Sequence, residues 1–478
     1  MRYIDKIYID GRFVTPLGSQ TFDLHNPVTE EKIGVVRLGN AEDAQAATAA
    51  AKRAFPGFSR TSKEERIDML KRLNEAVSAR IPELTEAMAL EYGAPQTFTR
   101  FAIPHAASSF LNMADVLREY AFERQMGRAQ VIMQPIGVTA AITPWNSNIG
   151  FISSKLATAI AAGTTIVIKP SEMSAIQTQV LVECLHESGL PKGVVNIVNG
   201  VGNVVGSELV RHPDIAKVTF TGSTAVGKDI MRTSAETLKR VTLELGGKGP
   251  NIILDDADLD VAIPGVLRMG FMNSGQACIA GTRILAPAHR LDDILARLKS
   301  AAAALKVGAP GDPETVIGPM VSQKQYDRVQ SYIQLGIQEG AKLLTGGSGR
   351  PDGLDRGWFT KPTIFFNVRN DMHIAREEIF GPVLSVIAYR NEEEAVSIAN
   401  DTAYGLQAYL HGSDTVRMRA LAERLDSGRV VINGAPHEPL APFGGFKQSG
   451  LGREYGVFGL EAFLEPKAVI SSGAVEPG

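Results

Sequence analysis

The sequence predicts an α/β fold with a parallel, doubly wound sheet, because short β-rich runs alternate with helical stretches through the middle of the chain. Parallel strands need crossover connections, which helices usually supply, so this alternation favours a Rossmann-type sheet. A second alternation starts at Asn251-Ile-Ile-Leu254, after the glycine-rich link 245–249, and predicts a second α/β domain. The five runs of the first alternation are 137–143, 164–169, 194–198, 217–221 and 240–244.

Length and composition indicate a globular chain that acts on a small molecule. Its 478 residues, 44% of them hydrophobic, can bury a large core in roughly three domains. The formal charge of −3 provides no positive field, so we expect neither nucleic acid nor membrane as a partner. The N-terminus lacks the apolar block of a signal peptide, and the longest apolar stretch, 156–168, is too short to span a bilayer. We therefore expect a cytoplasmic protein.

The N-terminal part should begin with an antiparallel hairpin that two helices follow. Asp10-Gly11 lies between two short apolar alternations in 6–14, a pattern typical of a tight turn. One Ala-rich helix should follow Asn40. Another should begin at Ser62, because the Ser62-x-x-Glu65 spacing is that of a capping box. Both helices should form surface layers.

The two cysteines require different interpretations. Cys184 falls at helical spacing on an apolar face, which indicates core packing. Cys278 follows Gly275-Gln-Ala, a flexible polar turn that is a poor place for packing, so we interpret it as a nucleophile. Two cysteines are too few for a disulfide framework or a four-thiolate zinc site, and we expect no metal.

A cysteine nucleophile needs oxyanion donors and a base, and the ends of the predicted strands supply candidates. Glu244 ends the fifth run, and Asn146 follows the first run after Pro144-Trp145. In such sheets ligands collect beyond the carboxyl ends of the strands. None of the eight histidines ends one of the five runs, which weakens a papain-like interpretation. Taken alone, Glu244 could equally be a surface glutamate at the end of a strand, and Asn146 could be an asparagine in a turn.

Three strand-to-helix loops could hold a dinucleotide. Lys169-Pro-Ser-Glu172 offers an ammonium and a carboxylate for ribose hydroxyls, although it could also be a solvated loop. Gly202-x-x-x-Gly206 and Gly222-Ser-Thr-Ala-Val-Gly227 place backbone amides at helix starts, where they could bind pyrophosphate oxygens. Neither matches G-x-G-x-x-G, and glycine-rich turns are common for steric reasons alone.

Together these motifs resemble the NAD(P)-dependent aldehyde dehydrogenase superfamily, of the hydrolytic, non-acylating type. Each motif is modest alone, but seven in one order along nearly the whole chain are very specific. They are Pro144-Trp-Asn146, Lys169-Pro-Ser-Glu172, Phe220-Thr-Gly-Ser223, Glu244-Leu-Gly-Gly-Lys248, Gly275-Gln-Ala-Cys278, Glu377-Glu-Ile-Phe-Gly-Pro382 and Pro442-Phe-Gly-Gly-Phe-Lys447, the last with Ser449-Gly450 and Gly452-Arg-Glu454.

The resemblance implies oxidation of an aldehyde to a carboxylate. Cys278 would attack the aldehyde, and the Asn146 amide and the Cys278 backbone N–H would hold the thiohemiacetal oxyanion. Hydride would pass to NAD, with NADP as an alternative, and water activated by Glu244 would hydrolyse the thioester. Glu454 would be a second carboxylate that relays protons, or else an ordinary surface charge.

The resemblance also implies a set of cofactor contacts. Lys169 and Glu172 would bind the adenine ribose, and Ser223 the pyrophosphate. Glu378 would hold the nicotinamide ribose, with Phe380 packed nearby. Glu172 favours NAD, because its carboxylate would repel the extra phosphate of NADP. The remaining expected contacts are Ile142, Thr143, Pro144, Trp145, Ser171, Gly202, Gly206, Phe220, Thr221, Gly222, Val226, Leu245 and Gly246.

Members of this family add β-strands to a neighbouring subunit, so the resemblance implies a homodimer or homotetramer. Segments 128–134 and 466–471 fit that role, because exposed β-edges need a partner. Arg453 and Glu465 match positions that tie this interface to the catalytic domain. The expected domains are a dinucleotide-binding domain over 1–116 and 136–246, a catalytic domain over 247–448, and an oligomerisation hairpin and C-terminal strand over 117–135 and 449–478.

Three alternatives stay open. A CoA-acylating dehydrogenase would pass the thioester to a thiol, but such enzymes tend to lack the glutamate at the position of Glu244. A non-catalytic protein that keeps the fold is disfavoured by the intact Cys278, and a thiol hydrolase would need no nicotinamide. The residues do not identify the aldehyde. Ser147 stands where many relatives have a bulky aromatic residue, and Phe443 matches a common aromatic wall position.

Overall fold

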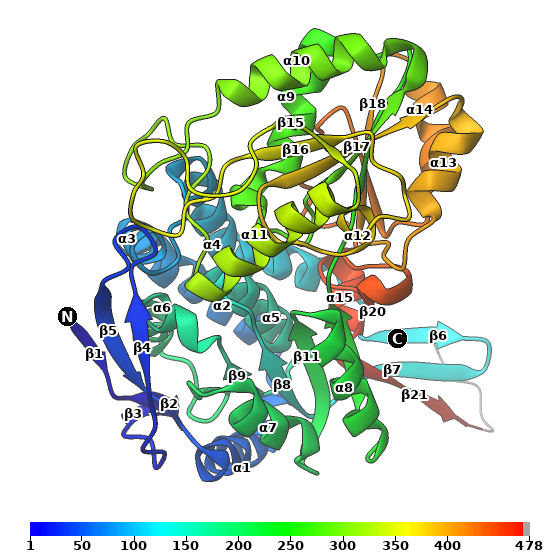
Figure 1. Cartoon of the computed structure of the whole chain (residues 1–478). Coiled ribbons are helices and arrows are strands. Elements are labelled where there is room, and N and C mark those ends of the chain that lie inside the picture. Colours follow the sequence, from blue (N-terminus) through cyan, green and yellow to red (C-terminus); the bar gives the residue numbers. More distant parts are fainter. Residues whose placement is uncertain (472–478) are drawn as a thin grey trace.

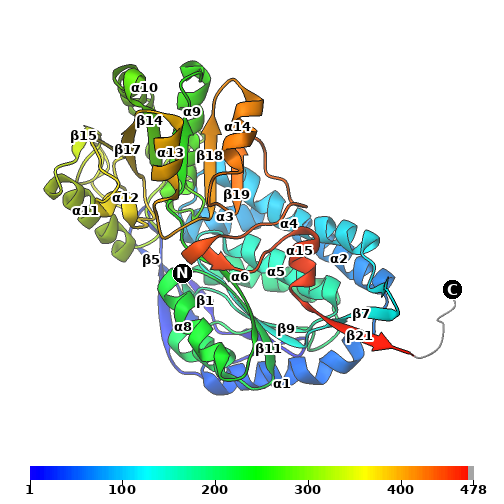
Figure 2. The same ribbon diagram turned by 90° about the vertical axis from the view of Figure 1, so that its right-hand side faces the viewer.

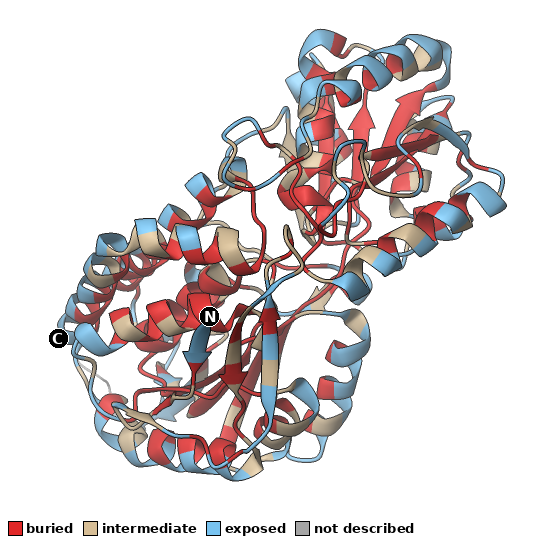
Figure 3. Cartoon of the chain, turned by 60° about the vertical axis from the view of Figure 1, so that its left-hand side comes forward, coloured by how far each residue is buried: buried red, intermediate tan, exposed pale blue. Residues whose placement is uncertain are grey.

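The computed structural model describes residues 1–471 as two α/β lobes with a small β-sheet that projects from the first lobe (Figures 1 and 2). Buried residues concentrate in the two large sheets and in the inner faces of the helices that cover them, and the two lobes meet at a narrower junction (Figure 3). Residues 472–478, the end of the predicted segment 449–478, lie outside the described residues.

An eight-stranded sheet forms the centre of the first lobe. The five predicted strands are confirmed as β8 (Val138–Ile142), β9 (Ile166–Lys169), β10 (Val195–Ile197), β11 (Ile215–Thr221) and β12 (Arg240–Glu244). They are parallel, in the order β12-β11-β8-β9-β10. The chain therefore winds first to one side of β8 and then to the other. Beside such a reversal, the carboxyl ends of the strands open a crevice for ligands.

Short antiparallel strands extend both edges of this sheet. β2 (Ile7–Ile9) and β3 (Arg12–Val14) form the predicted hairpin beside β10. Asp10 and Gly11 at its turn have φ of 53° and 74°, and two left-handed residues match the twist of the flanking strands. At the other edge β20 (Gly450–Leu451) pairs with β12.

Helices cover both faces of the first sheet. Both predicted helix starts are confirmed: α1 (Ala41–Phe58) is capped by Asn40 and α2 (Lys63–Ala79) by Ser62, each through a capping box. One face packs against α1, α7 (Ser207–Arg211) and α8 (Thr224–Ala235). The other face packs against α2, α4 (Gln96–Glu119), α5 (Asn148–Ala162) and α6 (Ala175–Glu187).

The second lobe contains a seven-stranded sheet that is parallel except at one edge. Its order is β15 (Lys342–Thr345), β16 (Thr363–Phe366), β17 (Val383–Tyr389), β14 (Arg283–Pro287), β13 (Pro250–Ile253), β18 (Gln407–His411) and β19 (Arg429–Ile432). One face packs against α9 (Leu259–Gly270) and α10 (Leu291–Ala303). The other packs against α11 (Gln323–Gln338), α12 (His373–Arg376), α13 (Glu392–Asn400) and α14 (Thr415–Ala422). The predicted second α/β alternation is thus present.

The projecting sheet joins segments from distant parts of the chain. β7 (Ala129–Pro135) pairs on one side with β6 (Glu123–Met126) and on the other with β21 (Leu464–Ile470), which follows α15 (Gly456–Glu461). Every residue of β6 is exposed, as are the last five of β21. The expected domain boundaries do not coincide with element ends throughout, because α4 runs across residue 116 and β20 joins the first sheet.

A small sheet and one helix of the first lobe lie outside the predicted alternation. β1 (Arg2–Ile4), β5 (Lys32–Arg37) and β4 (Thr21–His25) form a separate three-stranded sheet, and α3 (Ile81–Glu91) packs beside α6. No helix within residues 1–471 is long and apolar enough to cross a membrane.

Candidate active site

The predicted catalytic residues come together where the two lobes meet. Asn146 follows β8 and Glu244 ends β12, both at the carboxyl edge of the first sheet. Cys278 lies in the loop between α9 and β14 of the second lobe. Figure 2 shows this junction between the sheets. The long-range contacts described below bring all three side chains to it.

The cysteine loop has an unusual backbone. Asn273, Ser274 and Gly275 have φ of 51°, 59° and 73°, three consecutive left-handed residues. For the two non-glycine residues this conformation costs roughly 1–3 kcal/mol each, and it persists only where the surroundings enforce it. A Cβ at Gly275 would lie 2.2 Å from the backbone oxygen of Gly381, so only glycine fits this position.

Polar side chains hold the loop in that shape. The Ser274 hydroxyl accepts from the Gly318 amide at 2.8 Å. Gln276 donates to the Pro319 carbonyl at 3.2 Å and accepts from the Val321 amide at 2.9 Å. These bonds tie the residues just before the thiol to the segment 318–321, and they fix the backbone of the loop from one side.

Asn146 fixes the loop from the other side. Its Nδ2 donates to the Gln276 carbonyl at 3.0 Å, and its backbone carbonyl accepts from Asn273 Nδ2 at 3.1 Å. Asn146 is buried. The structure thus places the predicted amide within two residues of Cys278, although the two are far apart in sequence. Asn273, which sequence analysis missed, completes the bridge.

Cys278 is half-buried at the crevice. Burial, followed by the charges of Glu378 and Glu244, raises the pKa of its thiol to about 12. The glycine link lies directly against it, since a Cβ at Gly247 would lie 2.4 Å from the Cys278 carbonyl oxygen. Cys184 of α6, by contrast, is fully buried in the core of the first lobe, which confirms its predicted role in packing.

Glu244 is buried, with 3% of its surface exposed. Neither carboxyl oxygen has a hydrogen-bond partner among residues 1–471. Burial, with a further contribution from Glu454, raises the pKa of Glu244 well above its usual range, and Lys155 and Arg453 oppose this shift. A raised pKa makes this carboxylate a stronger base than a solvated one.

Glu454 forms an ion pair with Lys155 of α5, and both side chains are buried. Thr219 of β11 accepts from Lys155 Nζ at 3.1 Å and donates to Glu454 at 3.3 Å. The second predicted carboxylate is therefore buried beside Glu244, and the interpretation as an ordinary surface charge is wrong. Sequence analysis missed Lys155 because it lies in the middle of a helix whose other residues have the apolar pattern of a buried helix.

The predicted dinucleotide residues line the same edge of the first sheet. Lys169 Nζ donates to the carbonyls of Pro170 and Gly200 at 2.7 and 2.8 Å, and lies 3.4 Å from Glu172. A Cβ at Gly206 would lie 3.6 Å from Lys169 Cδ and 3.7 Å from Ile142 Cδ1, whereas a Cβ at Gly202 would meet open space. Ser171 caps the helical turn 172–174.

The second glycine loop begins α8. Ser223 caps this helix by accepting from the Val226 amide at 3.4 Å, and Gly222 lies under the ring of Phe220. Leu245 packs on Gly227, and Gly246 accepts from the Ser449 hydroxyl at 2.6 Å. Thr221 Oγ1 and Asn199 Oδ1, which close β11 and follow β10, are buried without partners among the described residues. Unpaired polar atoms, glycines and a helix start at one edge fit a dinucleotide.

The second lobe contributes Glu378 and Phe380 to this crevice. Glu378 Oε1 accepts from the Gly247 amide at 3.0 Å, and burial raises the pKa of its carboxyl to about 7. The Phe380 ring meets Trp145 edge-on at 5.4 Å between centroids. Lys248 was missed: it is buried, its Nζ has no partner in residues 1–471, and burial lowers its pKa to about 7.

Comparison with known proteins agrees with this geometry. Residues 13–469 match the model of the aldehyde dehydrogenase family. The 3-succinoylsemialdehyde-pyridine dehydrogenase of a Pseudomonas species is 45% identical over 98% of this chain and 99% of that protein. Aldehyde dehydrogenase C of Pseudomonas syringae, solved with NAD+ and octanal, superimposes with a TM-score of 0.97 at 44% identity, covering 98% of each chain.

A Mycobacterium tuberculosis aldehyde dehydrogenase, solved with NAD+, has a TM-score of 0.96 at 40% identity, over 99% of this chain and 100% of that one. The fold and the crevice thus define a nicotinamide-dependent oxidoreductase. The chain belongs to the aldehyde dehydrogenase family, and it oxidises aldehydes with NAD(P).

Proposed function

We propose that Cys278 is the nucleophile, that Asn146 and the Cys278 backbone N–H stabilise the oxyanion, and that Glu244 activates water. One observation carries this proposal: the Asn146 amide bonds to the loop that holds the thiol, beside a buried carboxyl group without a partner among the described residues. A nucleophile, an oxyanion donor and a base are the parts that a thioester mechanism requires.

In the first step the Cys278 thiol gives its proton to water, the thiolate sulfur attacks the aldehyde carbon, and the carbonyl oxygen becomes an oxyanion. Asn146 Nδ2 carries two hydrogens, of which one is bonded to the Gln276 carbonyl. The second is therefore free to donate to the oxyanion. Asn273 Nδ2 donates to the backbone carbonyl of Asn146 and so fixes the main chain from which this side-chain amide projects. Asn146 is thus oriented before the substrate binds, so its donor needs no reorganisation during the reaction.

NAD, when bound along the first sheet, supplies the hydride acceptor. We assign its adenine ribose to Lys169 and Glu172, its pyrophosphate to Ser223 and the glycine loops, and its nicotinamide ribose to Glu378. Glu172 favours NAD over NADP through charge repulsion.

Hydrolysis of the thioester needs a base for the attacking water. The raised pKa of Glu244, caused first by burial, makes this carboxyl group a stronger base than a solvated one. Water loses a proton to Glu244 and adds to the thioester carbon, the Cys278–carbon bond breaks, and the acid and the thiol are released. Glu454 and Lys155, which form a buried pair beside Glu244, would take the proton onward.

We also propose a homodimer or homotetramer, because β6 and β21 leave long exposed edges on the projecting sheet. Glu465 of β21 forms an ion pair with Arg240 of β12, which joins the projecting sheet to the first sheet at the surface. A working thiol has to stay reduced, and this requirement supports a cytoplasmic location.

The test is the formation of NADH or NADPH from a panel of aliphatic, aromatic and semialdehyde substrates, with and without CoA. We expect reduced cofactor and free acid without CoA. Cys278→Ala should abolish turnover while cofactor affinity stays within about twofold. Glu244→Gln should keep a burst of NADH and slow the steady rate. Products that form only with CoA would establish the acylating reaction instead, and activity of Cys278→Ala within tenfold of wild type would remove Cys278 as the nucleophile.

A further inference from the structure

Arg429 lies one residue from a tight backbone contact between Gly428 and Gly444, a residue that borders the active site. It is the first residue of β19, directly after Gly428. A Cβ at Gly428 would lie 1.7 Å from the Gly444 oxygen, and a Cβ at Gly444 would lie 2.6 Å from Glu244 Oε1. The base, the 443–444 segment and the start of β19 are therefore stacked against one another.

The Arg429 side chain lies on the face of the second sheet that carries the cysteine loop. Its backbone pairs with Gln407 of β18, and residues paired in register share a face of a sheet. Tyr409, two residues along β18 on that same face, donates its hydroxyl to the Ile279 carbonyl at 2.7 Å. Since Ile279 follows Cys278, the guanidinium and the thiol belong to the same region of the molecule.

Arg429 has no counter-ion among the described residues. Its guanidinium stacks over the Phe443 ring at 5.5 Å, but it makes no hydrogen bond and no ion pair with any residue of 1–471. It is partly buried, so this charge is also poorly hydrated. The other arginines without such a bond in the described chain are all exposed, so solvent can hydrate their charge. They are Arg2, Arg128, Arg211, Arg268 and Arg419.

An aromatic wall runs from Phe443 to the surface; we define it as Phe101, His105, His437, Tyr455 and Phe443. Centroid distances between successive rings are 5.3, 4.8, 5.6 and 5.7 Å. Phe101 is exposed, whereas Phe443 pairs by its backbone with Glu454 in the active site. The wall therefore links solvent to the buried carboxyl groups, with Arg429 at its inner end.

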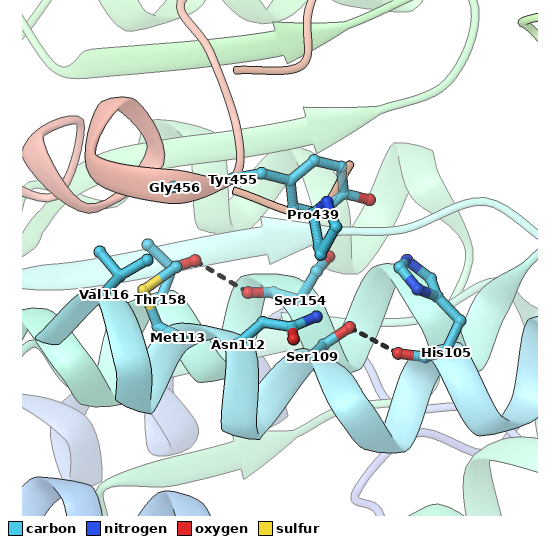
Figure 4. A pocket seen from close by; sticks show the side chains of 10 residues that line it. All are labelled: His105, Ser109, Asn112, Met113, Val116, Ser154, Thr158, Pro439, Tyr455 and Gly456. Carbon is cyan, nitrogen blue, oxygen red and sulfur yellow. Dashed lines mark hydrogen bonds between the residues drawn. The ribbon is translucent and has the colours of Figure 1, made fainter. Parts of the chain in front are cut away.

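This wall also carries polar atoms. Nε2 of His437 is buried and has no partner among the described residues. Burial, and then the charge of Arg429, lowers the pKa of both His105 and His437, which favours the neutral form of both rings. Figure 4 shows the pocket beside the wall, where His105 and Tyr455 face Ser154, Asn112 and neighbouring side chains. Neutral imidazoles can donate to a substrate without competing with the guanidinium for its charge.

The backbone of the wall is constrained. Tyr455 has φ of 67° and ψ of 158°, a conformation that bulky residues rarely adopt. A Cβ at the next residue, Gly456, would lie 2.0 Å from the Leu440 oxygen, so the chain is tightly packed there. This packing holds the Tyr455 ring between Phe443 and His437, and the wall is preformed.

We propose that Arg429 binds a carboxylate at the far end of the substrate, so that this enzyme prefers aldehydes that also carry an acid group. The proposal rests on the proposed function, because it assumes that the aldehyde end reaches Cys278. A guanidinium offers a planar fork of donors that matches a carboxylate, and such bonds are strongest where both groups leave water. A substrate acid would supply the counter-ion that Arg429 lacks, and the ring walls would enclose the atoms between the two ends.

The first test compares an acid with its uncharged ester, 4-carboxybenzaldehyde and methyl 4-formylbenzoate, together with aliphatic aldehyde acids and their methyl esters. For the wild type we expect kcat/KM to favour the acid at least tenfold in one of these pairs. Arg429→Met should reduce that ratio at least tenfold, mainly through KM, and Arg429→Lys should restore part of it. Arg419→Met, which removes an exposed arginine without a bond on α14, should leave the ratio unchanged. A ratio that Arg429→Met does not alter would overturn the proposal.

The second test needs no turnover. Calorimetry measures binding of 4-carboxybenzaldehyde to Cys278→Ala and to Cys278→Ala/Arg429→Met, with the methyl ester as control. We expect at least tenfold weaker binding of the acid to the double variant and little change for the ester. Because this result is independent of catalysis, it separates failure at Arg429 from failure of the proposed reaction. Equal binding of the acid to both proteins would count against the carboxylate site.

Light scattering tests the remaining role for the guanidinium. β19 is an edge strand, so a second copy of the chain could supply an acid group to Arg429. If Arg429→Met changes the association state and lowers kcat/KM equally for acid and ester, Arg429 is an interface cation and the proposal is wrong. An unchanged association state with a changed acid-to-ester ratio supports it.

Discussion

The thiol of Cys278 should react slowly with iodoacetamide in the cofactor-free protein, and its rate should rise steeply with pH. Only the thiolate is alkylated. Burial is the largest cause that raises the pKa of this thiol to about 12, with Glu378 and Glu244 contributing, while backbone amides oppose the shift. At pH 7–8 nearly all of the protein therefore carries a neutral thiol.

The size of the effect follows from that pKa. At pH 8 a free thiol of pKa about 8.5 is roughly one quarter ionised. A pKa of about 12 leaves about one thiolate in 10,000, which is roughly 3.4 log units less. A more basic thiolate is also a better nucleophile, and a Brønsted slope of about 0.45 returns roughly 1.6 of these log units. Cys278 should thus react about 60-fold more slowly than an unstructured cysteine.

Peptide-resolved mass spectrometry measures this rate between pH 6 and 10, with a short unstructured cysteine peptide as reference. Cys184, which is fully buried, provides an internal control, and Cys278→Ser identifies the signal. Restricted access would lower the rate at every pH, so the slope is decisive: it should stay near tenfold per pH unit up to pH 10. A plateau of the alkylation rate below pH 9 would refute the raised pKa of Cys278. It would mean that other groups offset the effect of burial on the thiol.

Four further outcomes follow from the geometry. Gly275→Ala should lower NADH formation roughly 100-fold in a folded protein checked by circular dichroism, because its Cβ would displace the loop against the Gly381 oxygen. Glu91→Ala should cost about 3 kcal/mol in urea unfolding, because Glu91 accepts from two buried amides at the start of α6; Glu91→Gln should cost less. Lys155→Met should cost about 3 kcal/mol in the same assay, since it leaves a buried carboxylate without its cation. Glu172→Gln should raise kcat/KM with NADP relative to NAD about tenfold in a spectrophotometric assay, because it removes a like charge.

Local patterns predicted the elements that repeat along the chain. All five strands from β8 to β12 were found, because each is a short apolar run and a helical segment follows each of the first four. The small sheet of β1, β5 and β4 was not predicted, and neither was β20. These strands lie outside the regular alternation of strands and helices, and their pairing depends on where distant parts of the chain meet.

The catalytic residues were predictable because they occupy strand ends and a glycine-rich turn. Their motifs also resembled one family, so the assignment did not depend on any single residue. Lys155, Asn273 and Arg429 were missed for a different reason. Lys155 lies inside a buried helix, Asn273 in a loop whose left-handed backbone no sequence pattern announces, and Arg429 at the start of an edge strand. Each acquires its role from long-range packing.

The strain in the cysteine loop explains why so many residues around the thiol form hydrogen bonds to this loop. Two non-glycine residues in left-handed conformations cost roughly 1–3 kcal/mol each, so an isolated loop would relax. Asn146 is anchored to the first sheet and segment 318–321 to the second lobe, and both bond to this loop. The two lobes therefore share the task of holding the thiol. A change that loosens the junction should lower activity before it lowers the stability of either lobe, because the strained loop is the part that depends on both.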